Sequence, residues 1–458
     1  MAKKNIQVLT SSQRILNDSR EYSTYVCSTR AIPSIHDGLK TGQRIALWLL
    51  RNRADKMKTF ALSGQMGFER LYVHGEASAN GAINLLAAPY KNNVPLIKGL
   101  GQFGSRVAPV EGIGAPRYTD VARSKAAEAF LYNDLDLVPL KDNYDGSNKE
   151  PVHFLPLIPL VLLNGVKGVA VGWATNILPR SLKTVIQATQ DALMDRPVKT
   201  MKPHFDKYNL TIQEGKKDRQ WMFSGKATVE DTSTVRITEL PPSLDIADFR
   251  KRLIEMEDAE SIVRYVDRST DCIDITVKFK RGSIAGWTEQ RAIDFFKLTE
   301  TATENITVIG WSGQNILSYP SAEQIVVEFA KWRLGWYSTR FEKKISDTSY
   351  ELNYWMVLEA LFKGGFTSKL GTFGNRAEVE AEVTKVATKA KLTLDDAQMD
   401  RVVSLPTYRW TKEFEAKVKE KIAELKADLK EYNAILKSPE RLKQVYYDEL
   451  EALKKMKF

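Results

Sequence analysis

Arg117 and Tyr118 are adjacent in the run APRYT and are well suited by type to nucleophilic chemistry. A tyrosine that loses its proton can attack an electrophile and hold it as a covalent ester. The ordinary pKa of tyrosine is about 10, so a neighbouring cation or a bound metal ion must help it to ionise. Taken alone, the pair is a weak signal, because most tyrosines are packed side chains with a hydrogen-bonded hydroxyl.

The histidines and cysteines add one further candidate. Two cysteines and four histidines are scattered along the chain, without the spacing of a structural zinc site and without an HExxH pair. His74, in the run HGE, is the histidine that we single out, although a lone histidine is more often a structural residue. We therefore expect no metal site within this chain, no disulfide framework and a reducing compartment.

The charge balance indicates a polyanionic partner. The chain has 458 residues and a formal net charge of +10, which favours nucleic acid or an acidic membrane surface, although many soluble enzymes are equally basic. The most apolar run, residues 154–163, is interrupted by Pro156 and Pro159 and is too short to span a bilayer. The first residues also lack the apolar run of a signal peptide. We expect a cytoplasmic or nucleoid-associated protein with no membrane contact.

The length predicts two to four domains that position these residues. Residues 1–25 have the composition of a polar arm or a leading helix, and residues 30 to about 160 are mixed in pattern. Residues 161 to about 320 contain runs with β-strand alternation, of which 235–240 and 273–279 are the clearest. Pro241 and Pro242 should end the first of these runs.

The last third of the sequence is helical in pattern. Ser321 and Gln324 have the spacing of a capping box, which predicts a helix over residues 325–332 that continues past Arg340. Ser438 and Pro439 are suited to the N-cap and first position of a final helix. Between them, one apolar stripe predicts a long helix through Phe414, Val418, Ile422, Leu425, Leu429, Tyr432 and Leu436. Long helices side by side predict a coiled-coil arm, with residues 370–411 at its tip.

Six runs of sequence together resemble one known family. Their order and spacing resemble the breakage-and-reunion region of type IIA DNA topoisomerases, and six linked motifs are far more specific than any one of them. The runs are AIPSIHDGLKTGQR (31–44), YVHGEAS (72–78), GLGQFGSR (99–106), APRYT (115–119), DNYDG (142–146) and LPLIPLVLLNGVKGVAVGWATNI (155–177). The words GLKTGQR and HGEAS resemble the phage and eukaryotic branch more than gyrase, and the short chain resembles the split topoisomerases of T4-type bacteriophages.

The resemblance implies an α+β multidomain fold. It implies an N-terminal arm over residues 1–25, a winged-helix DNA-gate domain with the catalytic tyrosine over 26–160, and a β-rich tower domain over 161–335. It further implies a long coiled-coil arm with a helical exit gate over residues 336–458.

The resemblance also implies the chemistry. Tyr118 would form a transient 5′-phosphotyrosyl link, which conserves the energy of the phosphodiester while a second duplex passes through the break. Arg117 would stabilise the charge that builds on the phosphate, and the simpler alternative is an ordinary phosphate contact. His74 would lie near the scissile phosphate.

Several further residues would contact DNA by the same resemblance. Lys40 and Arg44 would contact phosphates, and Arg30 and Arg106 are weaker candidates of the same kind. The alternative for each of the four is a solvated surface charge, and for Arg30 and Arg106 the two interpretations are equally favoured. Ser78 would begin a recognition helix whose N-terminus favours phosphate. The remaining positions are an apolar residue that would insert between base pairs, and positions at which this sequence differs from its gyrase-type relatives.

Val169 occupies the position where the family usually has isoleucine, a residue that wedges between base pairs and bends the duplex. The smaller side chain puts the depth of insertion in question, and the alternative is an ordinary strand residue. Tyr72 and Val73 precede His74 where gyrase-type relatives have a second histidine, and Gln43 agrees with eukaryotic relatives rather than gyrase.

Partners follow from what the sequence does not contain. We find no ATPase domain, no acidic TOPRIM metal motif and no DNA-wrapping propeller. We therefore expect a homodimer on double-stranded DNA, with Mg²⁺ and ATP bound by a partner subunit that carries the ATPase and TOPRIM parts. The alternatives are a non-catalytic DNA-binding clamp that retains the fold, and a basic structural protein of chromatin or of a virion.

Overall fold

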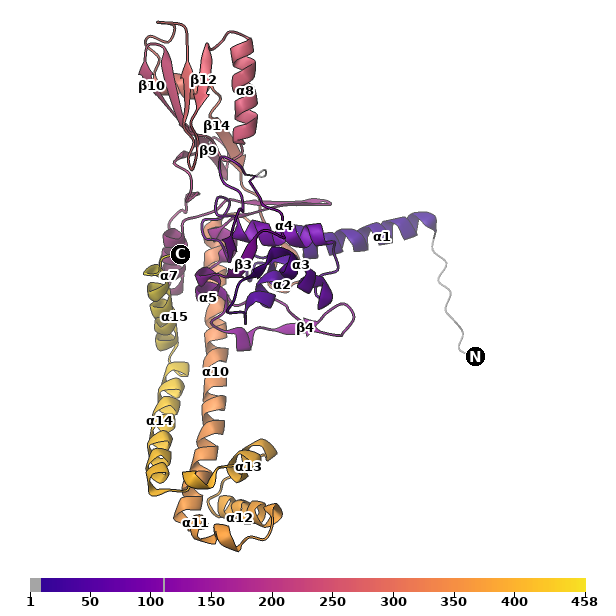
Figure 1. Ribbon diagram of the computed structural model, residues 1–458, viewed down its shortest axis with the longest axis vertical. Helices are drawn as coiled ribbons and strands as arrows, with labels where there is room; N and C mark the ends of the chain where they lie inside the picture. The colour runs from indigo at the N-terminus through magenta and orange to yellow at the C-terminus, as the bar shows by residue number, and fades with distance from the viewer. Residues whose placement is uncertain (1–9, 110–111) are drawn as a thin grey trace. The chain divides into compact units, whose positions relative to one another are not determined.

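The computed structural model describes residues 10–109 and 112–458. They divide into two units, one of residues up to 333 together with 449–458 and one of residues 334–448. Helices and strands are mixed along the first unit, whereas the second unit is helical (Figure 1). The expected combination of α and β structure is therefore confirmed.

The chain begins with a helix that buries none of its side chains. Helix α1 (Ser11–Val26) starts at Thr10, whose hydroxyl accepts a hydrogen bond from the Gln13 N–H while the Gln13 side chain accepts one from the Thr10 N–H. This reciprocal capping satisfies two N–H groups that a helix start leaves unpaired. A π-helical turn, η1 (Cys27–Ala31), follows and carries Arg30.

Three helices and a small sheet form the part of the first unit that carries most candidate residues (Figure 1). The helices are α2 (Thr41–Leu50), α3 (Thr59–Phe68) and α4 (Glu76–Ala87). Helix α2 buries eight of its ten residues, because RIALWLL is apolar almost all round. The antiparallel sheet has the order β1-β3-β2, from strands β1 (Met57–Lys58), β3 (Asp120–Arg123) and β2 (Ile97–Leu100).

Two exposed hairpins follow this group. The first pairs β4 (Leu140–Asp142) with β5 (Lys149–Pro151), and the second pairs β6 (Val166–Ala170) with β7 (Trp173–Ile177). Short helical segments precede and separate them: α5 (Lys125–Leu131), η2 (Leu135–Leu137) and α6 (Leu160–Leu163).

The β-strand patterns of the next region are confirmed. The two runs become β11 (Thr234–Glu239) and β13 (Ile275–Lys278), which pair antiparallel with Val235 opposite Val277. Their alternate apolar residues are buried under α8 (Ile246–Asp258) and α9 (Glu289–Phe295), and Pro241 follows the end of β11. The sheet has the order β10-β11-β13-β12, with β10 (Lys226–Asp231) and β12 (Arg264–Asp267) at its edges.

The rest of the first unit connects these parts. It contains α7 (Leu182–Leu193), a sheet β14-β9-β8 and a hairpin β15-β16. The strands are β8 (Thr211–Glu214), β9 (Gln220–Ser224), β14 (Thr299–Thr303), β15 (Ile306–Ile309) and β16 (Ile316–Tyr319).

The predicted helix after Ser321 is much longer than its first turns suggested. Helix α10 (Ala322–Lys363) has 42 residues. The Ser321 hydroxyl accepts a hydrogen bond from the Gln324 N–H, but the Gln324 side chain donates to Glu328. Only one half of the predicted capping box is therefore formed.

The helical second unit confirms the predicted long helix. Helix α14 (Lys412–Leu436) buries Val418 and Ile422 of the apolar stripe in one core with α10 residues such as Leu358, and Leu425 is buried as well. Helix α15 (Pro439–Lys454) starts where the sequence predicted, with the Ser438 hydroxyl accepting from the Arg441 N–H. The remaining elements of this unit are α11 (Phe366–Lys369), η3 (Leu370–Thr372), α12 (Arg376–Lys389), α13 (Asp396–Val403) and η4 (Thr407–Arg409).

Candidate functional site

Tyr118 lies on a tight loop that presents its ring to solvent. The side chain is 68% exposed, although the next residue, Thr119, is buried. The Thr119 hydroxyl lies 2.7 Å from the hydroxyl of Thr59, and the Thr119 carbonyl accepts a hydrogen bond from the Thr59 N–H. The Phe60 N–H likewise donates to the Pro116 carbonyl. The loop is thus fixed to the start of α3 while the phenol remains accessible.

Arg117 supplies a cation beside this phenol. Its guanidinium carbon lies 4.6 Å from the centre of the Tyr118 ring, and the residue is exposed. A guanidinium at this distance favours negative charge on nearby oxygens and can still bind a phosphate. The two residues therefore form an accessible nucleophile and cation on a fixed backbone.

His74 is the centre of a second cluster. The Arg30 Nε donates to His74 Nε2 at 3.1 Å, a second Arg30 nitrogen contacts Nδ1, and the Tyr25 hydroxyl lies 3.0 Å from Nε2. Tyr72 packs edge-on to the same ring, with centroids 4.9 Å apart, and its hydroxyl lies 2.8 Å from the Ser78 hydroxyl. Partial burial and the charge of Arg30 lower the pKa of His74, so the ring is neutral near pH 7.

Ser78 lies in the first turn of α4, as the sequence predicted for the start of a helix. Its cluster and the Tyr118 loop are separate within one chain. In residues 10–109 and 112–458, no hydrogen bond, ion pair or ring contact joins Tyr118 or Arg117 to His74 or Arg30.

Lys40 contacts the β6–β7 hairpin, and Val169 lies farther along the same hairpin. The Lys40 ammonium donates to the Lys167 carbonyl at 2.9 Å, and burial lowers the pKa of Lys40. The hairpin also lies close to the backbone of Ala31. Glycine is required at position 168 for this close contact, because a Cβ there would overlap the Ala31 carbonyl oxygen. Beyond this point the hairpin is exposed, and Val169 is 82% accessible near its turn.

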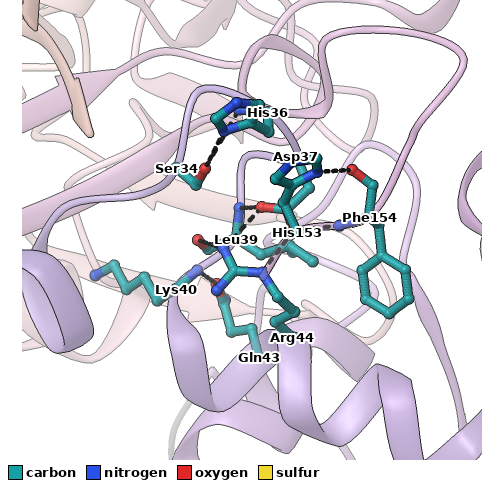
Figure 2. A network of polar contacts seen from close by, with 9 residues as sticks. All are labelled: Ser34, His36, Asp37, Leu39, Lys40, Gln43, Arg44, His153 and Phe154. Carbon is teal, nitrogen blue, oxygen red and sulfur yellow. Dashed lines mark hydrogen bonds and ion pairs between the residues drawn. The ribbon is translucent and has the colours of Figure 1, made fainter. Parts of the chain in front are cut away.

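Arg44 has a different place from the phosphate contact expected from the sequence. Its side chain is 9% exposed and forms a two-pronged ion pair with the fully buried carboxylate of Asp37, with distances of 2.7 and 2.9 Å (Figure 2). The same carboxylate accepts hydrogen bonds from the Leu39 and Phe154 N–H groups. Arg44 therefore stabilises the 37–44 segment through buried contacts. The expected contact of Arg44 with a DNA phosphate is wrong.

Arg106 is also engaged within the chain. Its guanidinium pairs with Glu239 at 2.5 Å and lies over the Tyr208 ring at 3.7 Å, and its side chain is only 10% exposed. A positive group buried in an ion pair cannot reach a phosphate without breaking that pair. Arg106 therefore connects the GLGQFGSR run to strand β11. Like Arg44, it is not available to contact a DNA phosphate.

Two stacked histidines lie beside the Asp37–Arg44 pair and escaped the sequence analysis. The rings of His36 and His153 are parallel, with centroids 4.1 Å apart, and both residues are 7% exposed (Figure 2). Burial and the neighbouring His153 lower the pKa of His36 to about 3, and burial also lowers that of His153. Trp311 and Trp332 pack edge-on against the His36 ring.

Acid should destabilise the first unit through this stack. Because the folded pKa of His36 lies below its ordinary value of 6.5, its neutral form stabilises the fold above pH 6.5, and this contribution is lost as the pH falls toward 3. From pH 7 to 5, His36 alone should cost about 2 kcal/mol. Denaturant unfolding followed by tryptophan fluorescence should show this loss in the wild type, and His36→Gln should reduce it by about that amount. The exposed His204→Gln is the matched control, and an unchanged pH dependence in His36→Gln would contradict the assignment.

The described residues contain no evident metal centre. In residues 10–109 and 112–458, no group of three or more His, Cys, Asp or Glu side chains is placed to hold a metal ion. Nor does any helix in that part of the chain combine the length and apolar character that crossing a membrane requires.

Comparison with known proteins places this geometry in a family. Residues 30–451 match the family of the A-type subunits of DNA gyrase/topoisomerase IV. The chain is 29% identical to the DNA topoisomerase medium subunit of Enterobacteria phage T4, over 96% of this chain and 97% of the phage protein. It is 31% identical to DNA topoisomerase 2-beta of Gallus gallus over 68% of this chain, but only 20% of that protein. The chain thus spans about a fifth of this eukaryotic relative.

The fold is also shared with a solved structure. The DNA-binding, cleavage and re-ligation domain of Plasmodium falciparum topoisomerase II matches with a TM-score of 0.82 and 22% sequence identity. The match covers 96% of this chain and 63% of that one.

Proposed function

The chain belongs to the family of DNA gyrase/topoisomerase IV A-type subunits, the breakage-and-reunion subunits of type II topoisomerases, and from this we propose that it cuts and reseals double-stranded DNA through Tyr118. The Tyr118 oxygen attacks a backbone phosphorus, the bond to the 3′ oxygen breaks, and the 5′ phosphate stays on the tyrosine. The 3′ hydroxyl carries the proton away and reverses the reaction when it attacks in turn. Two such cuts open a duplex for the passage of another.

One observation carries the proposal. Tyr118 is 68% exposed on a backbone that Thr119 fixes to α3, and a guanidinium lies directly beside it. A structural tyrosine would instead bury its ring and bond its hydroxyl. A nucleophile that attacks a large, rigid substrate must be reachable from solvent and must be held in place by its backbone. Tyr118 meets both requirements.

We assign the helpers by charge and position. Arg117 stabilises the negative charge that builds on the attacked phosphate. His74, whose pKa is lowered by partial burial and by the charge of Arg30, is oriented by Arg30 and Tyr25 and can bind a phosphate oxygen or take a proton near the cut. We assign Lys40, Tyr72 and Ser78 to contacts with the DNA phosphate backbone. Such contacts fix the register of the protein on the duplex without reading its sequence.

We propose finer domain assignments than the two units described above. In this proposal, helices α2 to α4 and the sheet β1-β3-β2 form a winged helix, with α4 as its recognition helix. We assign residues 1–25 to an arm, 26–160 to this DNA-gate domain, 161–335 to a tower domain and 336–458 to a coiled-coil arm with an exit gate.

An exposed face of α3 supports a homodimer. Phe60 and Phe68 are 48% and 87% exposed, and the space above Gly64 and Gly67 is open. These residues follow helical spacing, so they form one face that a second copy of α3 could cover. Such a dimer places two Tyr118 residues on one duplex, one for each strand.

Mg²⁺ and ATP are assigned to a partner subunit. Among the described residues, no group of three or more His, Cys, Asp or Glu side chains is placed to hold Mg²⁺. A partner with ATPase and TOPRIM parts would supply both, and we place the complex on DNA in the cytoplasm, which is the host cytoplasm if the protein is viral. The chain by itself should then be nearly inactive.

Val169 is proposed as the wedge that bends the DNA. Val169→Ala should reduce the bend and slow cleavage by about tenfold, because the wedge no longer offsets the cost of unstacking a base step. Fluorescence energy transfer between the ends of a short duplex measures the bend. Val171→Ala on the same hairpin is the control, since Val171 is also exposed, at 64%. An equal loss of bending in both variants would contradict a specific wedge.

The function is tested by the linking number of a DNA circle. With the partner, ATP and Mg²⁺, the complex should change the linking number of supercoiled DNA in steps of two, because each event passes one duplex through another. Steps of one, or no change while DNA still binds, would overturn the proposal.

A further inference from the structure

The loop at residues 142–148, which contains the run DNYDG, contacts the turn between α3 and α4. Asn143, only 6% exposed, donates from Nδ2 to the Arg70 carbonyl at 3.0 Å. Asn148 donates to the Glu69 carbonyl at 3.3 Å, and the Arg70 guanidinium pairs with Asp145 at 2.8 Å. Two successive carbonyls and one side chain of the turn are therefore held by a hairpin more than 70 residues away.

The loop itself is built to present these groups. The Asn143 carbonyl accepts from the Gly146 N–H, and Gly146 has a φ of +72°, which a glycine adopts without strain. The Ser147 hydroxyl and N–H both donate to Asp145, at 2.5 and 3.0 Å. These bonds, and then the pairing with Arg70, lower the pKa of Asp145, so its carboxylate is charged at neutral pH.

Arg70 is held in an unfavourable backbone conformation. Its φ is +56°, in the left-handed region that disfavours side chains with a Cβ. Its N–H donates to the Gly67 carbonyl, and the next two N–H groups, of Leu71 and Tyr72, both donate to Met66. The sharp reversal at Arg70 thus sets the direction in which the chain enters the 72–78 segment.

The direction of the turn matters because the His74 cluster follows immediately. The Tyr72 ring lies against Gly42, where an added Cβ would come within 2.9 Å of it, and Tyr72 in turn packs on His74. A change at Arg70 would therefore move Tyr72 and His74 together.

We propose that Asn143 is a positioning residue for DNA cleavage: by holding the Arg70 carbonyl it fixes the left-handed turn that places Tyr72 and His74 at the cut. This inference rests on the proposed function. Asn143 does not touch DNA; it acts through the backbone of residue 70.

The strength of the hydrogen bond between Asn143 and the Arg70 carbonyl sets the expected change in cleavage rate. Loss of the Asn143 amide leaves the Arg70 carbonyl without its buried donor, and such a loss corresponds to about a tenfold change in the population of a conformation. Asn143→Ala should therefore form the covalent DNA adduct about tenfold more slowly at saturating DNA, with the dissociation constant for the duplex changed by less than about twofold.

The rescue experiment separates positioning from a general structural role. In the complex with the partner subunit, Arg70→Gly should restore the rate of Asn143→Ala to within about threefold of wild type, because glycine adopts this φ without a donor to hold it. Arg70→Ala removes the same ion pair with Asp145 but keeps a Cβ, so it should not rescue. Asn143→Asp, which keeps the side-chain shape and loses the donor, should repeat the defect if Asn143→Ala folds poorly.

The possible failures are distinct. A wild-type complex that forms no adduct would refute the proposed function and this inference with it. If the wild type cleaves DNA and both Asn143 variants cleave it at the wild-type rate, the positioning role of Asn143 is refuted, whereas the proposed function stands. Rescue by Arg70→Ala as complete as by Arg70→Gly would show that charge, rather than backbone direction, carries the effect, and would also overturn the proposal.

Discussion

Tyr118→Phe is expected to abolish covalent capture of DNA while the complex still binds DNA. Phenylalanine keeps the ring beside Arg117 but removes the oxygen that attacks phosphorus. Removing a nucleophile costs at least about ten-thousandfold in rate, because the residual binding groups cannot form the ester. The assay mixes the complex with supercoiled DNA and Mg²⁺, denatures it with detergent and counts protein joined to 5′ ends.

Tyr144→Phe is the matched control for this change. Tyr144 is also 68% exposed and also lies on a loop of the first unit, so the two tyrosines differ in position rather than in accessibility. The control should keep the wild-type yield of adduct. Persistent adducts in Tyr118→Phe, or their loss in Tyr144→Phe, would move the nucleophile to another residue.

Asp37→Ala is expected to destabilise the first unit more than any surface charge change. It leaves the guanidinium of Arg44 buried without its partner and removes the acceptor of the Leu39 and Phe154 N–H groups. Breaking a buried ion pair from one side costs about 3–5 kcal/mol. Denaturant unfolding of the first-unit transition would measure this loss, and DNA cleavage should fall with the folded fraction.

The controls for Asp37 separate burial from charge. Asp18→Ala, which removes one partner of an exposed ion pair with Arg14, should cost less than about 1 kcal/mol. The double change Asp37→Ala with Arg44→Leu should recover part of the stability, because no unpaired charge then remains in the core. A loss below about 1 kcal/mol for Asp37→Ala would show that solvent reaches Arg44 and would restore it as a candidate for DNA contact.

Local patterns allowed much of the fold to be predicted. The apolar stripe of α14, the alternation in β11 and β13, and the start of α15 at Pro439 are properties of a few neighbouring residues. The full length of α10 was not predictable, because apolar and polar residues alternate around it without one clear face. The family itself was recognised from linked motifs, and the match over residues 30–451 confirms it.

The site was harder to predict, because its contacts join distant residues. Arg44 looked like a surface cation, since nothing local shows that Asp37 folds back on it in the core. Tyr25 and Arg30 meet His74 across 49 and 44 residues, and Asn143 meets Arg70 across 73. Such contacts depend on how helices pack, so sequence periodicity carries no signal for them. The roles of Tyr118, Arg117 and His74 remain predictions that geometry supports.

DNA cleavage by Tyr118 is tested most sharply by identifying the amino acid that holds the DNA. The complex would be trapped on a short duplex by denaturation, digested with nuclease and protease, and the modified peptide sequenced by mass spectrometry. We expect one nucleotide-bearing peptide, with the mass of a 5′-phosphate ester on Tyr118. A modified peptide from elsewhere in the chain, or none while the duplex is still bound, would contradict it and favour a clamp that holds DNA without cutting it.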